Sequence, residues 1–285
     1  MTTKQSRQRQ FGWAIRQVIL YSLLLVLGLA FLLPFLWTLS SSLKPAGSGF
    51  KFPPEFLPKE FVWGNYPQVF VMIPFMSFFR NSLFVTGMSV LGELISASLV
   101  AYAFARLRFP GRDTLFLLVL ATMMIPYPVT MVPTFILFKL LGLVNTYFPL
   151  ILPPWLGPAF SIFLLRQFFL TINTELDEAA KVDGASEFLI YRRIIIPLSK
   201  PVLATVAIFG FVAYWNDFLN PLIYLSESSM YTLALGVNFL RSFRGGGELS
   251  IQMAASVMFV APCILLFIIA QRYVVEGIVT TGIKG

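Results

Sequence analysis

Few side chains in this sequence could do chemistry, and they fall into two groups. The chain has no histidine and one cysteine, Cys263, which excludes His-based acid–base catalysis, a His/Cys metal site and a disulfide within it. The first group is two acids, Glu93 and Asp217, that interrupt apolar runs, and the second is a polar, acid-rich segment, residues 173–201. We therefore expect no catalytic residue, no cofactor and no metal, and look to these groups for binding or coupling.

Asp217 lies in a cluster of aromatic and polar residues near the end of an apolar run. Such side chains can hydrogen-bond to a sugar and stack on it, which makes them candidates for the path of a solute. The cluster consists of Tyr214, Trp215, Asn216, Asp217 and Asn220. A polar hinge in a helix broken at Pro221 explains the same residues equally well. The sequence leaves both interpretations open.

Glu93 is an acid whose role is open, within another apolar run. An acid inside a membrane is costly enough to suggest a function. However, its neighbours Ser89, Gly92, Ser96 and Ala97 are small, which is typical of closely packed helices. We therefore prefer a structural role, with Glu93 neutral or bonded to a neighbouring helix, over contact with a solute.

The elements that must position these residues are membrane helices. The chain is 57% hydrophobic and 12% charged, with a mean hydropathy of +0.79, whereas soluble domains are roughly 45–50% apolar and about 25% charged. The sequence predicts an all-α, polytopic membrane protein. Its transmembrane domain is residues 18–274, after a segment 1–17 and before a tail 275–285. The six expected spans, each about 20 apolar residues long, are 18–39, 82–104, 114–138, 147–165, 202–225 and 253–274.

Three regions of this pattern are irregular. Residues 61–79 are apolar, but prolines, Asn65 and Gln68 interrupt them, so we expect a short interfacial helix outside the membrane. The third span should kink near Pro126. The fourth holds several prolines, which predict a broken outer end instead of regular helix.

Lys and Arg residues are distributed unequally between the two sides of the predicted membrane. More of them, including the cluster Arg106, Arg108 and Arg112, fall on the side of the N-terminus. By the positive-inside rule, both termini and residues 173–201 are cytoplasmic. The net charge of +8 therefore reports topology, and we expect a lipid bilayer and no nucleic acid as partner.

Residues 173–201 should form two short helices. Thr174 and Asp177 resemble a capping box, and Gly184 predicts a C-cap and a turn. The second helix should cover residues 185–193, with Pro197 interrupting it before the membrane.

One face of the first of these helices combines an apolar residue, two alanines and an acid. Leu176, Ala179, Ala180 and Asp183 share it at helical spacing, and two adjacent alanines would let another protein approach closely. From the residues alone, a docking element and a surface linker that covers the bundle are equally good interpretations.

A family resemblance favours docking. The spacing of Glu178-Ala179-Ala180, Gly184, Ile194, Ile196 and Pro197 resembles the EAA loop of binding-protein-dependent ABC transporter permeases, with Ile196 where leucine is usual. Five further segments are similar to the carbohydrate-uptake permeases, above all to the shorter, six-span partner of the maltose-type pair. They are residues 34–45, 101–113, 124–133, 141–147 and 271–285.

The resemblance implies a non-catalytic permease subunit of an ATP-driven importer in the inner membrane of a prokaryotic cell. It implies as partners a second, longer permease, two copies of a cytoplasmic ABC ATPase that bind the ATP, and an extracytoplasmic solute-binding protein. Loop 226–250 would reach the binding protein, and the flexible tail 280–285 would enter the interface between the ATPase subunits. The residues implied to couple to the ATPase are Glu178, Ala179, Ala180, Asp183, Gly184 and Pro197.

Other functions remain as alternatives. Importers of this type also serve non-sugar solutes such as glycerol phosphodiesters. An ion-coupled secondary transporter would need its own ion-coupling residues, for which only Glu93 and Asp217 are available. A membrane-embedded enzyme would need a catalytic cluster, and the sequence contains none.

Overall fold

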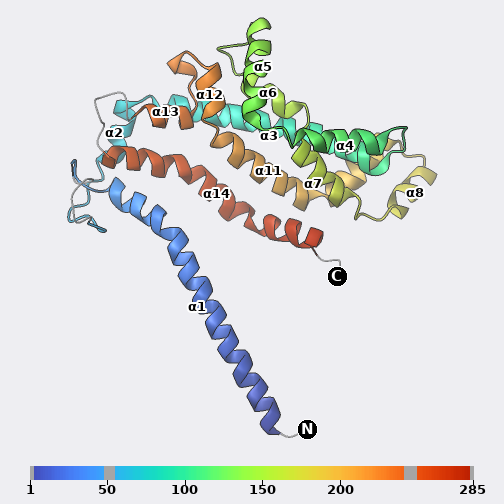
Figure 1. Ribbon diagram of the computed structural model, residues 1–285, viewed down its shortest axis with the longest axis horizontal. Helices are drawn as coiled ribbons and strands as arrows, with labels where there is room; N and C mark the ends of the chain where they lie inside the picture. Colours follow the sequence, from blue (N-terminus) through green and yellow to red (C-terminus); the bar gives the residue numbers. More distant parts are fainter. Residues whose placement is uncertain (1–2, 48–54, 241–248, 283–285) are drawn as a thin grey trace. The chain divides into compact units, whose positions relative to one another are not determined.

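The structure is a computed structural model that describes residues 3–47, 55–240 and 249–282, without side chains for 3–12, 14 and 272–282. Every long element in these ranges is a helix, and none is a strand, which confirms the all-α prediction (Figure 1). The chain divides into two compact units, which we describe separately. One comprises Met1–Met72 and Leu240–Met258, the other Ile73–Phe239 and Phe259–Gly285.

The first unit contains the long helix α1 (Thr3–Ser42) and the short helix α2 (Asn65–Met72). The buried amide of Asn65 donates hydrogen bonds to the carbonyls of Ser42, at 2.8 Å, and Lys44, at 2.9 Å, which ties the start of α2 to the end of α1. Because α1 begins at Thr3, residues 3–17 of the predicted N-terminal segment belong to the same helix as the first span.

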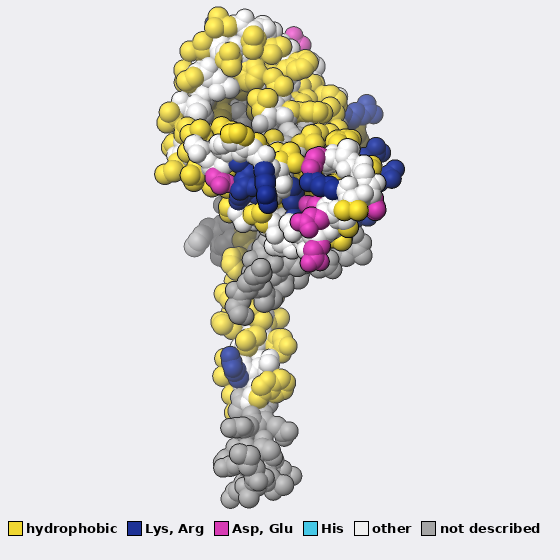
Figure 2. Space-filling view, turned by 90° about the vertical axis from the view of Figure 1, so that its right-hand side faces the viewer, with side chains coloured by type: hydrophobic (Ala, Val, Ile, Leu, Met, Phe, Trp, Pro, Cys, Tyr) yellow, Lys and Arg dark blue, Asp and Glu magenta, His cyan; other side chains and the backbone are white. Residues whose placement is uncertain are grey.

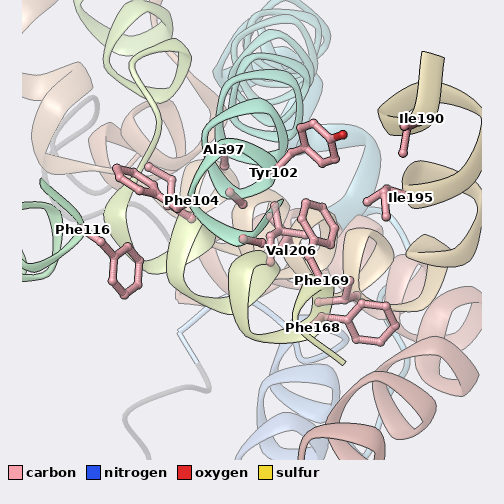
Figure 3. Packing of buried hydrophobic residues seen from close by; sticks show 14 residues of the cluster. Ala97, Tyr102, Phe104, Phe116, Phe168, Phe169, Ile190, Ile195 and Val206 are labelled. Carbon is pink, nitrogen blue, oxygen red and sulfur yellow. The ribbon is translucent and has the colours of Figure 1, made fainter. Parts of the chain in front are cut away.

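The second unit is built around α3 (Phe75–Arg106). Helices α6 (Phe148–Trp155), α7 (Ala159–Phe169) and α11 (Lys200–Trp215) pack against it. Figure 3 shows the hydrophobic cluster at this contact, where Ala97 and Tyr102 of α3 face Phe169 of α7 and Val206 of α11. Helix α4 (Arg112–Thr122) joins through Phe116, whose ring centroid lies 5.5 Å from that of Phe104.

The described residues contain four helices that are long and apolar enough to cross a membrane. They are Ile15–Ser42, Phe75–Arg106, Phe148–Phe169 and Leu249–Gln271. Two bent helix pairs raise the number to six if each pair is one span. They are Arg112–Thr122 with Tyr127–Leu140, bent by 97°, and Glu187–Leu198 with Lys200–Trp215, bent by 78°. The six predicted spans correspond in order to these six segments.

The predicted interfacial helix 61–79 is shorter than expected. Helix α2 ends at Met72, and α3 begins at Phe75, several residues before the predicted start of the second span at 82. Pro74 explains the boundary, because a proline cannot continue the hydrogen bonding of α2, while its carbonyl accepts from Ser77 and Phe78 and so starts α3.

Breaks divide the third and fourth predicted spans. The break between α4 and α5 (Tyr127–Leu140) ends at Pro126, where a kink was predicted. The fourth span differs from the prediction, because its outer part, α6, is helical even though Pro153 and Pro154 lie inside it, and the break lies between α6 and α7. Pro149 stands in the first turn of α6, where a helix tolerates proline. Gly157, at φ +79°, occupies the break instead.

The fifth and sixth predicted spans also differ in extent. Helix α11 ends at Trp215, and a separate helix α12 (Leu219–Tyr224) follows, so residues 202–225 are not one helix. Next come η3 (Ser228–Met230), α13 (Leu233–Phe239) and α14 (Leu249–Gly282). Helix α14 passes the predicted end at 274 and includes most of the tail, while 241–248 of the outer loop and 283–285 lie outside the described residues.

Candidate functional site

The acidic helix of the polar segment is α8 (Glu175–Val182), which begins where the sequence predicts but by another contact. Thr174 makes no side-chain cap, so the predicted capping box is absent. Asn173 takes its place, because its Oδ1 accepts from the Glu175 amide at 3.1 Å and its Nδ2 donates to the Glu175 carboxylate at 3.0 Å. The acids of the first turn still lie at the positive end of the helix dipole.

The end of α8 is the turn predicted at Gly184. Gly184 has φ +80°, its amide donates to the carbonyl of Lys181 at 3.0 Å, and Ala185 donates to Ala180 at 2.9 Å. This pair of bonds is the Schellman motif, in which a left-handed residue satisfies the last carbonyls of a helix. The prediction for Gly184 as C-cap is confirmed.

The second helix of the segment is longer than predicted. It starts at α9 (Glu187–Ile190), where the Ser186 hydroxyl accepts from the Leu189 amide. It continues through a π-helical turn, η2 (Tyr191–Ile195), into α10 (Ile196–Leu198). Pro197 therefore does not end the helix after Arg193, because the widened turn accommodates its missing amide, and the chain bends only after Leu198.

The predicted coupling residues divide into an outer and an inner set. Glu178, Ala179 and Asp183 are exposed, as are Gly184 and Pro197. Figure 2 shows acidic and basic side chains gathered at this end of the second unit, in contrast to the hydrophobic surface elsewhere. Ala180 differs from its neighbour Ala179, because it is half-buried and packs against the hydrophobic cluster. One alanine of the pair is thus free for a partner, and the other fixes α8.

Asp177 faces inward from α8. Its Oδ2 lies 3.4 Å from Nε of Arg106, the last residue of α3, with side chains 11% and 4% exposed, respectively. Burial raises the pKa of the Asp177 carboxyl, while Arg106 and Lys181 oppose the rise. This ion pair lines a hollow of about 820 Å³ between the end of α3, the loop after it and α8. The hollow is lined by Ala105, Arg106, Leu107, Arg108, Phe109, Arg112, Thr174, Asp177, Glu178, Lys181 and Glu187.

Apolar packing holds the second helix of the segment to the bundle. In Figure 3, Ile190 and Ile195 point from α9 and η2 toward Tyr102 and Phe169, and both isoleucines are fully buried. The hydroxyl of Tyr191 lies 2.7 Å from that of Ser98, which adds a polar contact to the same face.

The intramembrane acid Glu93 is buried between three helices. Its Oε1 accepts from the Ser161 hydroxyl of α7, and Tyr214 of α11 faces the same carboxyl group. Its Oε2 lies so close to Gly210 of α11 that a side chain there would collide with it. These contacts support the preferred structural role, since the carboxyl group lies inside the bundle.

The predicted solute-path cluster forms a helix break. Asp217 accepts from the backbone amide of Asn220 at 3.2 Å and from its side chain at 2.8 Å, and the Tyr127 hydroxyl of α5 donates to the Asn220 side chain. Asn216 is exposed and bonds back to Val212. These hydrogen bonds fit the hinge interpretation, because they join residues around the break in the helix.

Trp215 does not fit the sugar-stacking hypothesis. It is 1% exposed, its Nε1 donates to the carbonyl of Phe259 at 3.0 Å, and its ring packs on Phe79, Phe211 and Phe259. A ring enclosed in this way is core, and the assignment of Trp215 to a solute surface is corrected. Tyr214 is half-buried and turned toward Glu93.

Comparison with known proteins assigns the family. Residues 94–279 match the family described as the binding-protein-dependent transport system inner membrane component, which covers more than half of the chain and includes the whole polar segment. The chain belongs to this family.

Relatives of this permease cover between about three quarters and nearly all of its length. The arabinooligosaccharides transport system permease protein AraQ of Halalkalibacterium halodurans is 40% identical over 74% of the chain and 75% of its own length. The galactooligosaccharides transport system permease protein GanQ of Bacillus subtilis is 31% identical over 95% and 96%. A chain of a bacterial ABC transporter involved in the import of the acidic polysaccharide alginate has a TM-score of 0.79 and 25% identity, covering 92% of this chain and 97% of that one.

Sequence reasoning missed the pairing of two residues of this permease, Arg106 and Asp177. The sequence assigns Arg106 only to the charge asymmetry and Asp177 only to a capping box with Thr174. One weak signal existed, because Asp177 shares a helix face with Ala180, the half-buried residue three positions later. An acid on an inward face requires a partner, but nothing in the spacing identifies that partner as the end of α3.

Proposed function

We propose that this chain is the membrane-spanning permease of an ATP-driven importer for an oligosaccharide. It takes the solute from an extracytoplasmic binding protein and releases it into the cytoplasm. The chain itself is non-catalytic, and the ATP is bound and hydrolysed by two copies of a cytoplasmic ATPase that assemble with this chain and a second, longer permease. The charge bias of its loops supports a cytoplasmic location for both termini.

The exposed face of α8 is the observation that carries this proposal. Among its exposed residues, Glu178 and Asp183 lie on either side of the small residue Ala179, and Glu178 borders the hollow next to α3. A partner could approach Ala179 closely and place a basic group against Glu178. A helix that served only to cover the bundle would not need a small residue on its outer face.

The relatives support a carbohydrate as the solute, because two of them are named for transport of arabinooligosaccharides and galactooligosaccharides. Within this chain, the exposed Asn216 and the Asn220–Asp217 pair are candidates for the solute path. A glycerol phosphodiester is the second candidate solute, and an ion-coupled mechanism is the alternative of a different class.

Co-purification and a solute panel test the proposal together. The chain is purified from its native membrane, reconstituted with its binding protein, and assayed for ATP hydrolysis against oligosaccharides and a glycerol phosphodiester. We expect an ATPase and a longer permease to accompany it, and one oligosaccharide to stimulate hydrolysis. A lone chain that transports solute under an ion gradient without ATP would contradict the proposal.

A further inference from the structure

Helix α8 presents little apolar surface to the bundle. Of its residues, Asp177 is the buried one, while Val182 is 88% and Leu176 is 45% exposed. Ala180 adds only a partly buried methyl group. The buried isoleucines that hold α9 and η2 have no counterpart in α8. Hydrophobic burial therefore fixes the second helix of the segment and leaves α8 dependent on its polar contacts.

Arg106 makes the polar contacts at the start of α8. Its Nη2 donates to the carbonyl of Ile172 at 2.7 Å, and its Nε lies 3.4 Å from Asp177 Oδ2. A guanidinium offers several donors in one plane, so a single side chain reaches both the lead-in to α8 and its first turn. Removing either charge of a buried pair leaves the other without compensation, which makes the contact sensitive to substitution.

The far end of α8 reaches the same face of α3 by another route. Lys181 Nζ lies 2.6 Å from Glu187 Oε1, and the Tyr102 hydroxyl donates to Glu187 Oε2 at 2.8 Å. Tyr102 and Arg106 are one helical turn apart on α3. Both ends of α8 are thus connected to one face of the last turn of α3.

We propose that Arg106 is the positioning residue of α8: its pair with Asp177 fixes the helix to the end of α3, so that a displacement of α8 moves α3. The inference rests on the proposed role of α8 as the element that meets the ATPase. Without the pair, the start of α8 could shift while α3 stayed in place, because Lys181 and Glu187 connect only the far end of α8 to Tyr102. Helix α3 runs without a break from Arg106 to Phe75 and packs on α6, α7 and α11, so its movement reaches the centre of the bundle.

A distance measurement tests the positioning itself. In the assembled transporter with Cys263→Ser, spin labels are placed at two exposed positions, Val182→Cys on α8 and Leu99→Cys on α3. We expect one narrow distance in the parent, a broadened distribution in Arg106→Gln, and a narrow one again when the charges are exchanged in Arg106→Asp with Asp177→Arg. Arg108→Gln is the matched control, because Arg108 is exposed and lines the same hollow.

Transport measurements test the consequence. In Arg106→Gln, solute moved per ATP hydrolysed should fall by about tenfold while hydrolysis continues. The exchanged pair should recover the ratio, and Arg108→Gln should keep it. If Arg106→Gln fails to assemble, Asp177→Asn removes the same pair at nearly unchanged volume.

The inference is overturned if Asp177→Asn and every Arg106 variant that assembles keep the parental label distance and ratio. A chain that purifies without an ATPase contradicts the proposed function instead. The label distance in that chain still decides the role of Arg106.

Discussion

Replacing Gly184 by valine should uncouple ATP hydrolysis from uptake. Gly184 adopts φ +80°, and an added Cβ would meet no atom within 4 Å, so backbone conformation accounts for the whole cost. A left-handed conformation costs an L-residue about 1–2 kcal/mol. Since about 1.4 kcal/mol is a tenfold change in an equilibrium constant, the ratio of the native turn to other turn conformations should fall by roughly 5- to 30-fold. The ion pair of Asp177 would still hold the start of α8, while the chain after Gly184 would leave the helix in a different direction.

The assay is uptake and ATP hydrolysis by the reconstituted complex. Gly184→Asn should stay close to the parent, because asparagine tolerates the left-handed region. Gly142 is a matched control. It ends α5 with φ +68° and the same two Schellman bonds, Gly142 to Lys139 and Leu143 to Phe138, and its Cβ position is also open. If Gly184→Val kept the parental ratio of uptake to hydrolysis, or if Gly142→Val lowered it equally, the role of the Gly184 turn would be refuted.

Three further outcomes follow from the packing. Glu93→Leu should lower the free energy of unfolding by about 1–3 kcal/mol, because the hydroxyl of Ser161 loses its acceptor in a buried site. Glu93→Gln should cost less. Thermal unfolding in detergent measures both variants, and equal losses would contradict the hydrogen-bond argument. Trp215→Ala should lower the free energy of unfolding by about 3–5 kcal/mol in the same measurement, because the ring lies in the core. It should not change which solute stimulates ATP hydrolysis. An altered solute preference would restore the stacking hypothesis. Coupling should also weaken on acidification. Burial, with smaller contributions from Glu187 and Glu178, raises the pKa of Asp177 against the opposing effects of Arg106 and Lys181. The ion pair is therefore complete above this raised pKa and lost as the pH falls through it, so the ratio of uptake to hydrolysis should drop there in the parent and stay flat in Asp177→Asn.

Local signals in the sequence predicted the turns that depend on one residue. Gly184 follows a polar helix and ends it, because glycine can adopt the left-handed conformation that this turn requires. Pro126 ends the break between α4 and α5, because proline restricts the backbone and has no amide to donate. The prolines of α6 show the limit of this reasoning. Pro149 occupies a helix start, so it marks a boundary and does not disrupt the helix.

Features that depend on distant partners could not be predicted in the same way. Asp177 and Thr174 read as parts of a cap, but Arg106 across the bundle takes the carboxylate of Asp177, and Asn173 caps the helix instead. For Trp215, the sequence leaves two interpretations open, a surface for stacking a sugar and a polar hinge, because its neighbours are polar. The aromatic rings of Phe79 and Phe259, from two other helices, make it core.

Site-directed cross-linking from α8 tests whether its exposed face meets the ATPase. A photoreactive amino acid is placed at the exposed Ala179 and, as control, at the half-buried Ala180 of the same helix. We expect position 179 to capture an ATPase subunit in the assembled transporter, and position 180 to capture only residues of this chain. An intact, ATP-hydrolysing complex in which position 179 captures no ATPase would contradict it.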